Sequence, residues 1–249
     1  MSLEVEAAFW GGIAGLALLL GAALGYFVKL PHKIVASVMA FGAGVLISTL
    51  SFELMETATH KGGLLSSVMG FSFGVILYSS ANAVLSLYGA KHRKRSKFPG
   101  SHSAKGASTA IVLGAIIDGV PEAAAIGVSL LEGKGVALVT VLAIFLSNIP
   151  EGLSSSVGMR ASGKSARYVF GLWFSIAGVC AMSAWLGFRF LGLFGDIYVA
   201  FATAVAAGAI LVMILQTMVP EAFEDIHNIT GPVAAAGFLT AYSASVLLG

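Results

Sequence analysis

The chain has 249 residues, of which 57% are hydrophobic and 10% are charged, and its formal net charge at pH 7 is +2. Its mean hydropathy is +0.93. Soluble globular domains carry about a quarter charged residues, so this composition excludes an ordinary soluble domain and indicates an integral membrane protein. The single cysteine, Cys180, excludes an internal disulfide and any multi-cysteine metal motif, and we expect it to be a small buried side chain.

Apolar runs long enough to cross a bilayer as helices recur along the whole chain. A hydrocarbon core about 30 Å thick needs roughly 20 apolar residues in helical form. We therefore predict an all-α integral membrane protein, with a single transmembrane domain over residues 1–249 and eight transmembrane helices. The predicted spans lie near 7–28, 34–58, 64–89, 107–131, 135–159, 168–190, 197–222 and 231–248. Short loops join them, apart from a longer connection at 90–105.

The Lys and Arg residues predict how these spans are oriented, because cytoplasmic loops carry an excess of positive charge. With eight spans both termini share a side, and placing them extracytoplasmically puts 11 of the 14 Lys and Arg in cytoplasmic loops. These are Lys29, Lys33, Lys91, Arg93, Lys94, Arg95, Lys97, Lys105, Arg160, Lys164 and Arg167, against Lys61, Lys134 and Arg189 outside. The basic run KHRKRSK (91–97) then fits a cytoplasmic loop near anionic lipid, and nucleic acid is not expected as a partner.

Several acidic residues lie inside the predicted spans. Asp118, Glu122 and Glu151 lie well inside, and no Lys or Arg lies in the spans that carry acids. A buried carboxylate without a cationic partner costs several kcal/mol at least, so it protonates or recruits a cation. The pattern therefore predicts a cation pathway. Toward the span ends lie Glu53, Glu56 and Glu221.

Three stretches end in Pro-Glu: DGVPE (118–122), SNIPE (147–151) and TMVPE (217–221). Residues four apart share a helix face, so the Asp and the Glu of the first stretch lie together, as do Ser147 and Glu151 of the second. Asn148, three residues before that Glu, is also a neighbour.

Each proline inside a helix leaves the carbonyl four residues earlier without its usual donor, which requires a partner or a wet cavity in the membrane. The fourth and fifth spans are centred on residues 119 and 147, so their polar groups lie near the bilayer midplane, where transporters usually hold substrate. Together Asp118, Glu122, Ser147, Asn148 and Glu151 predict an oxygen-rich cage for a divalent cation.

With DGVPEA (118–123) in the fourth span and SNIPEG (147–152) in the fifth, the chain resembles the Zrt/Irt-like (ZIP) family of metal transporters. In that family these helices carry H-N-x-P-E-G-type motifs that bind one or two divalent metals. The resemblance implies metal binding by Glu122, Asn148 and Glu151. It also implies eight spans in an inverted 3+2+3 repeat, extracytoplasmic termini and a homodimer.

The chain departs from the family pattern in its histidines. Asp118 and Ser147 stand where the family often has His, and Gly119 replaces the first motif's Asn. The resemblance implies zinc as the cargo, while a donor set without imidazole leaves Mn²⁺, Fe²⁺ or Cd²⁺ open. All five histidines, His32, His60, His92, His102 and His227, lie in predicted loops or at helix ends.

Two further segments, ELMETA (53–58) and TMVPEA (217–222), would be counterparts in the inverted repeat. We expect Glu53 and Glu56 to attract metal at the outer side and Glu221 to receive it at the inner side. Gln216 stands where relatives often carry Glu, which makes it a weaker candidate ligand.

The expected function is import of a divalent transition metal into the cytoplasm by a multi-pass protein of the cell (inner or plasma) membrane. A proton-coupled carrier of another cation stays an alternative, and failure to bind transition metals would favour it. An intramembrane enzyme is a second alternative, but enzymatic activity is not expected. There is no His-Glu-x-x-His string, Asp118 is the only aspartate deep within a span, and no Lys or Arg accompanies the acids.

Overall fold

A computed structural model describes residues 2–28, 30–87, 104–132 and 138–248, with side chains at 2–28, 30–84, 114–131 and 138–247. Regular secondary structure in these residues is entirely helical. The α-helices are α1 (Leu3–Phe27), α2 (His32–Thr49), α3 (Met55–Leu87), α4 (Ala104–Ser129), α5 (Leu138–Ala161), α6 (Ala166–Leu191), α7 (Asp196–Met213), α8 (Val219–Ile226) and α9 (Thr230–Leu248). Shorter turns are η1 (Leu50–Leu54), η3 (Leu130–Glu132), η4 (Ile214–Met218) and η5 (His227–Ile229).

Five helical stretches in the described part of the chain are long and apolar enough to cross a membrane, which confirms the prediction of a helical membrane protein. They are Leu3–Phe27, His32–Val84, Leu138–Ala161, Ala166–Leu191 and Asp196–Leu247. Large apolar side chains such as Leu64 and Leu247 are 73% and 81% exposed, as expected of a surface that faces lipid. The predicted number of eight spans stays a prediction. The predicted loop 90–105 lies outside the described residues up to 103, and its last two residues already belong to α4.

Breaks within the two longest stretches divide them into shorter helices. Gly63 has φ 72° and ψ 175°, a conformation that only glycine adopts readily, so α3 consists of helical segments 55–62 and 64–87. His227 has φ 36° and lies where α8 gives way to α9. Because α-helical hydrogen bonding does not continue through such residues, each break allows the chain to change direction.

Two turns of π-helix interrupt the same long stretches. The first, η1, joins α2 to α3 and carries Glu53, and the second, η4, joins α7 to α8 and carries Gln216. Turns of π-helix are rare and are frequently found at functional sites. Both turns therefore mark the acidic segments that follow them as candidate functional regions.

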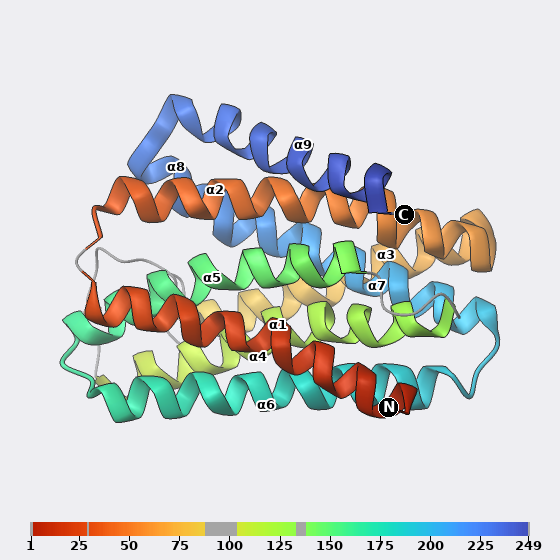
Figure 1. Ribbon diagram of the computed structural model, residues 1–249, viewed down its shortest axis with the longest axis horizontal. Coiled ribbons are helices and arrows are strands. Elements are labelled where there is room, and N and C mark those ends of the chain that lie inside the picture. The colour runs from red at the N-terminus through yellow and green to blue at the C-terminus, as the bar shows by residue number, and fades with distance from the viewer. Residues whose placement is uncertain (1, 29, 88–103, 133–137, 249) are drawn as a thin grey trace.

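The helices pack in two groups that meet along α2, α4, α5 and α7 (Figure 1). In the first group α1 packs on α5 and α6, and α4 packs on α6. In the second, α3 packs on α7, and α2 packs on α8 and α9. The main contacts between the groups are those of α2 with α5 and of α4 with α7. The helices that carry the candidate site, α4 and α5, thus lie where the two groups face each other.

Glycines bring the backbones of paired helices into direct contact. A Cβ added at Gly21 of α1 would lie 2.0 Å from the Ile149 carbonyl oxygen of α5, and one at Gly152 would lie 2.1 Å from that of Leu18. Small residues allow this approach in membrane helices, where close packing replaces the hydrophobic effect as the source of association. The backbone of α5 next to Glu151 is therefore held tightly against α1.

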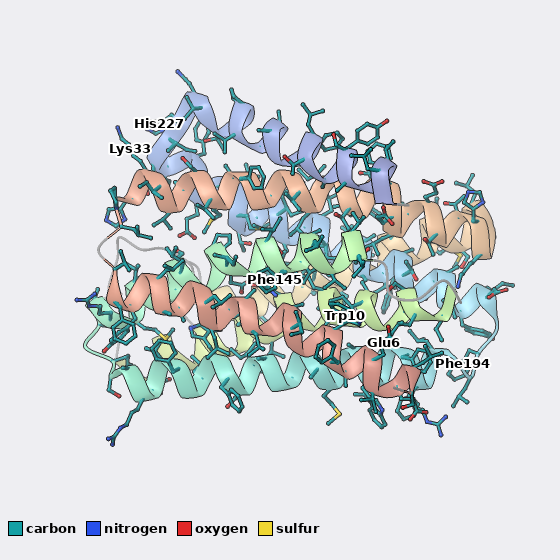
Figure 2. The ribbon with its side chains drawn as sticks, viewed as in Figure 1. Glu6, Trp10, Lys33, Phe145, Phe194 and His227 are labelled. Atoms are coloured by element: carbon teal, nitrogen blue, oxygen red, sulfur yellow. The ribbon has the colours of Figure 1, made fainter. Side chains whose placement is uncertain are left out.

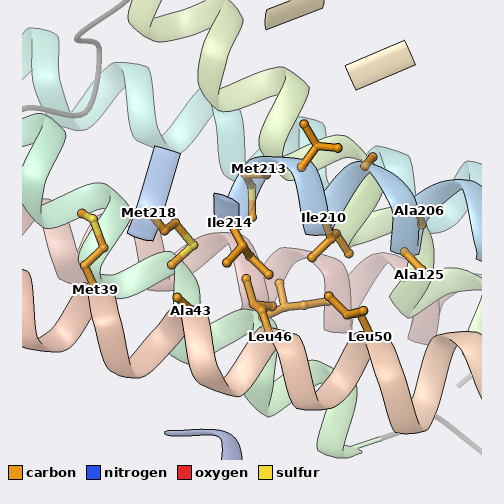
Figure 3. Packing of buried hydrophobic residues seen from close by; sticks show 14 of the residues in the cluster. Met39, Ala43, Leu46, Leu50, Ala125, Ala206, Ile210, Met213, Ile214 and Met218 are labelled. Carbon is orange, nitrogen blue, oxygen red and sulfur yellow. The ribbon is translucent and has the colours of Figure 1, made fainter. Parts of the chain in front are cut away.

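A buried apolar cluster fills the contact between α2 and the end of α7 (Figure 3). Met39, Leu46 and Leu50 extend from α2 and η1 toward Ile210 and Met213 of α7. The cluster also includes Ile126 of α4 and Ile144 of α5, so it reaches both helices that carry the candidate site.

The two ends of the bundle carry different side chains (Figure 2). Lys33 and His227 lie at one end, and Glu6 and Phe194 lie at the other. Both chain termini lie toward the Glu6 end (Figure 1). At this end the Arg189 Nε atom lies 3.4 Å from Glu4 Oε1. We call the two ends the Lys33 end and the Glu6 end below.

Candidate metal centre

The predicted cage residues are buried side chains on two proline-containing helices. Pro121 lies inside α4 and Pro150 inside α5, and each helix continues past its proline. Burial is nearly complete for the carboxylates, with Asp118 and Glu122 each 1% exposed and Glu151 7% exposed. Ser147 and Asn148 are buried as well.

Tyr78 of α3 is a further buried side chain and contacts Asp118. Its side chain is 2% exposed, and its hydroxyl donates a hydrogen bond to Asp118 Oδ1. Sequence reasoning missed this residue, because a tyrosine in an apolar span is equally consistent with packing or interface anchoring. The bond joins α3 of one helix group to α4 of the other.

We expect Tyr78→Phe to lower the thermal stability of the purified protein, because the buried Asp118 carboxylate loses a donor. A hydrogen bond to a charged group contributes about 1.5–3 kcal/mol. Thermal unfolding in detergent measures the effect. Tyr242→Phe is the matched control, since Tyr242 is 41% exposed on α9. Equal Tm values for the two variants would show that the Tyr78 bond contributes nothing.

The amide and hydroxyl of the second motif have defined hydrogen bonds. Asn148 Nδ2 donates to the Ala14 carbonyl oxygen of α1 at 2.9 Å. Ser147 Oγ donates to the Ile144 carbonyl oxygen, also at 2.9 Å. Because the donor hydrogens are directed to backbone carbonyls, the Asn148 Oδ1 atom and the Ser147 lone pairs are the groups that suit a cation.

Cys180 of α6 is buried, as expected, and lies beside the first motif. Its Sγ atom lies 4.0 Å from the Gly119 carbonyl oxygen, and a Cβ at Gly119 would lie 3.2 Å from that sulfur. Gly119, which has no side chain, thus leaves room for a thiol, which the sequence could not reveal.

The acids outside the cage are distributed along the bundle. Glu221 accepts a hydrogen bond from Ser154, which lies one turn after Glu151 on α5. Glu53 accepts one from Ser245 of α9. Neither serine partner was predicted, since each pairing joins residues far apart in the sequence.

Two other predicted residues lie at exposed positions. Glu56 Oε1 is 3.7 Å from His60 Nε2, and both side chains are largely exposed. Gln216 Oε1 accepts a hydrogen bond of 2.7 Å from Asn82 of α3, on the exposed surface of the bundle. The structure therefore places Gln216 apart from the buried cage residues.

In the described part of the chain, no three His, Cys, Asp or Glu side chains lie close enough together to hold a metal ion. A divalent cation at the cage would therefore need amide, hydroxyl or backbone carbonyl oxygens besides the carboxylates. Asn148, Ser147 and the carbonyls four residues before the two prolines are groups of this kind.

The fold is that of a helical membrane protein with buried carboxylates on two helices at the boundary between two helix groups. No family model matches the chain. A protein of Arabidopsis thaliana described as a "putative zinc transporter" is 27% identical to it over 232 residues. These residues make up 92% of this chain and 36% of the relative, so the chain spans little more than a third of that protein's length.

Proposed function

We propose that the protein is a transporter of divalent transition-metal ions, similar in mechanism and architecture to the ZIP family. The observation that carries this proposal is the burial of Asp118, Glu122 and Glu151 within two adjacent helices of a membrane protein. Ionised carboxylates at such a depth are costly unless a cation binds there. The similarity of nearly the whole chain to a putative zinc transporter supports the same class of cargo.

The cargo loses most of its water at the cage and binds to carboxylate, amide and hydroxyl oxygens. Zinc is the cargo that the relative's description favours. The oxygen-rich donors suit Mn²⁺, Fe²⁺ and Cd²⁺ as well, because neutral imidazole is missing from the predicted ligands. Glu221, bonded to Ser154 one turn beyond Glu151, provides the next carboxylate on the way out.

We further propose eight spans, with metal moving from the Glu6 end to the Lys33 end. The breaks at Gly63 and His227 divide the two longest stretches into two spans each, and α4 is the remaining span. The positive-inside bias supports extracytoplasmic termini and a cytoplasmic Lys33 end. The π-helical turns before Glu56 and Glu221 occupy matching places in α2–α3 and α7–α8, which supports the inverted repeat. We also propose that two copies of the protein form a homodimer.

Uptake by the reconstituted protein tests the transport function. Proteoliposomes with a metal-sensitive dye inside would be exposed to Zn²⁺, Mn²⁺, Fe²⁺ or Cd²⁺ outside. We expect saturable dye responses to at least one of these ions, above those of protein-free liposomes. An organic cation transported in the absence of any metal response would instead support a carrier of another cation.

A further inference from the structure

A small cavity with a mixed polar and apolar lining lies between helices of both groups. Its volume is about 20 Å³, room for roughly one water molecule. Four of its lining residues carry hydroxyl groups, and a fifth is a glutamate. The lining residues are Glu53, Leu54, Thr57, Ala125, Val128, Ser129, Thr140 and Thr203.

Two hydroxyl groups of this cavity donate hydrogen bonds to the helix backbone. Thr203 Oγ1 donates to the Val199 carbonyl oxygen at 2.8 Å, and Ser129 Oγ donates to that of Ile126 at 2.8 Å. A hydroxyl has a single hydrogen, so donation by Thr203 to the helix backbone leaves its oxygen as an acceptor. Lone pairs attract cations and repel anions.

A carboxylate adds negative charge to the same space. Glu53 lies in the π-helical turn η1 and accepts a hydrogen bond from Ser245 at Oε1, which leaves Oε2 available. Thr140 and Thr203, which line the cavity as well, are 1% and 2% exposed and therefore buried inside the bundle. Carboxylate and hydroxyl oxygens around a partly enclosed space suit a hard or borderline divalent cation.

The cavity lies on the same helix faces as the cage. Ser129 follows Glu122 by seven residues on α4, which is two turns or about 10 Å. Thr140 precedes Glu151 by eleven residues on α5, which is three turns or about 16 Å. Residues at these spacings share a face, so both hydroxyls lie in line with the cage carboxylates, on the side of the α4–α5 connection.

We propose that this cavity is a separate cation site, which holds a divalent metal ion before it reaches the cage. Only the order of these two sites rests on the proposed function; binding in the cavity does not. Because the space admits about one water molecule, an ion must lose most of its hydration shell to occupy it. Mg²⁺ dehydrates reluctantly, so the site discriminates against Mg²⁺ and in favour of Mn²⁺ and similar ions.

The test removes the cage and asks whether Mn²⁺ still binds. The full chain with Glu122→Gln and Glu151→Gln, in lipid nanodiscs, would be titrated with Mn²⁺ and followed by electron paramagnetic resonance. We expect one bound Mn²⁺ per chain, which excess Mg²⁺ displaces poorly. Adding Thr140→Val and Thr203→Val should weaken binding by about tenfold, and adding Glu53→Gln by about a hundredfold.

Thr49→Val is the matched control in this background. Thr49 is 3% exposed and its hydroxyl donates to the Val45 carbonyl at 3.1 Å, but it does not line the cavity. We expect no loss of Mn²⁺ affinity in this control. Absence of Mn²⁺ binding once the cage is removed, or equal affinity in the Glu53, threonine and Thr49 variants, would overturn the cavity site.

The same measurements separate this inference from the transport proposal. Hydroxyl-dependent Mn²⁺ binding by a protein that moves no metal would leave the cavity site standing and remove the transport function. Metal uptake by the wild type, together with no binding in the cavity, would remove the cavity site and leave the transport function standing. Glu53→Gln, which preserves side-chain shape, tests the site even if the double valine variant does not fold.

Discussion

Glu122→Gln and Glu151→Gln should each reduce metal uptake into proteoliposomes by at least about a hundredfold, since even partners of metal ligands typically contribute ten- to hundredfold. Each substitution removes the negative charge that draws a divalent cation to a buried position and preserves the shape of the side chain. Initial rates of dye response over a range of metal concentrations measure the effect.

The same variants should remain folded, because a neutral amide is less costly to bury than a carboxylate. We therefore expect Tm values equal to or above that of the wild type without metal. Glu6→Gln, at the end of α1 (Figure 2), is the matched control and should retain uptake. Wild-type uptake by both cage variants would refute the assignment of Glu122 and Glu151, whatever the protein transports.

Gly152→Ala should strongly destabilise the protein, although it adds a single methyl group. That Cβ would lie 2.1 Å from the Leu18 carbonyl oxygen and 2.9 Å from the Leu18 Cα, so α1 and α5 must separate. Overpacking of a core typically costs about 1–3 kcal/mol, and a contact with backbone has no flexible side chain to relieve it. Thermal unfolding and size-exclusion profiles in detergent measure the loss.

Gly178→Ala on α6 is the matched control, because nothing lies within 4 Å of a Cβ added there. In a helix interior, alanine is more favourable than glycine by about 0.5–1 kcal/mol, so this change should leave the Tm unchanged or raise it. We expect Gly152→Ala to lower the Tm and Gly178→Ala to leave it unchanged or raise it. Equal Tm values would show that the α1–α5 contact next to Glu151 is not tight.

Much of the candidate site could be expected from the sequence because charge within an apolar run is a strong local signal. Asp118, Glu122 and Glu151 stand out for this reason, and the helix period places Ser147 and Asn148 beside them. The structure confirms that all five side chains are buried. Their joint role in metal binding stays a prediction.

The partners of these residues could not be expected in the same way. Tyr78, Ser245 and Asn82 are ordinary residues of apolar or mixed segments, and each bonds to a residue more than a hundred positions away or on another helix. In a membrane, both the lipid-facing and the buried faces of a helix are apolar, so hydropathy does not reveal which face meets which neighbour. The roles of these residues depend on how each helix is rotated about its axis, because the rotation decides which side chains meet.

The sequence by itself determined the class of protein, its helical character and the burial of the carboxylates, since all three follow from hydropathy, length and helical period. Only the tertiary structure decided that Tyr78 bonds Asp118, that Cys180 lies beside Gly119 and that Thr140 and Thr203 enclose a cavity. These contacts depend on how closely helix backbones approach, and glycines such as Gly152 set that distance through packing between helices.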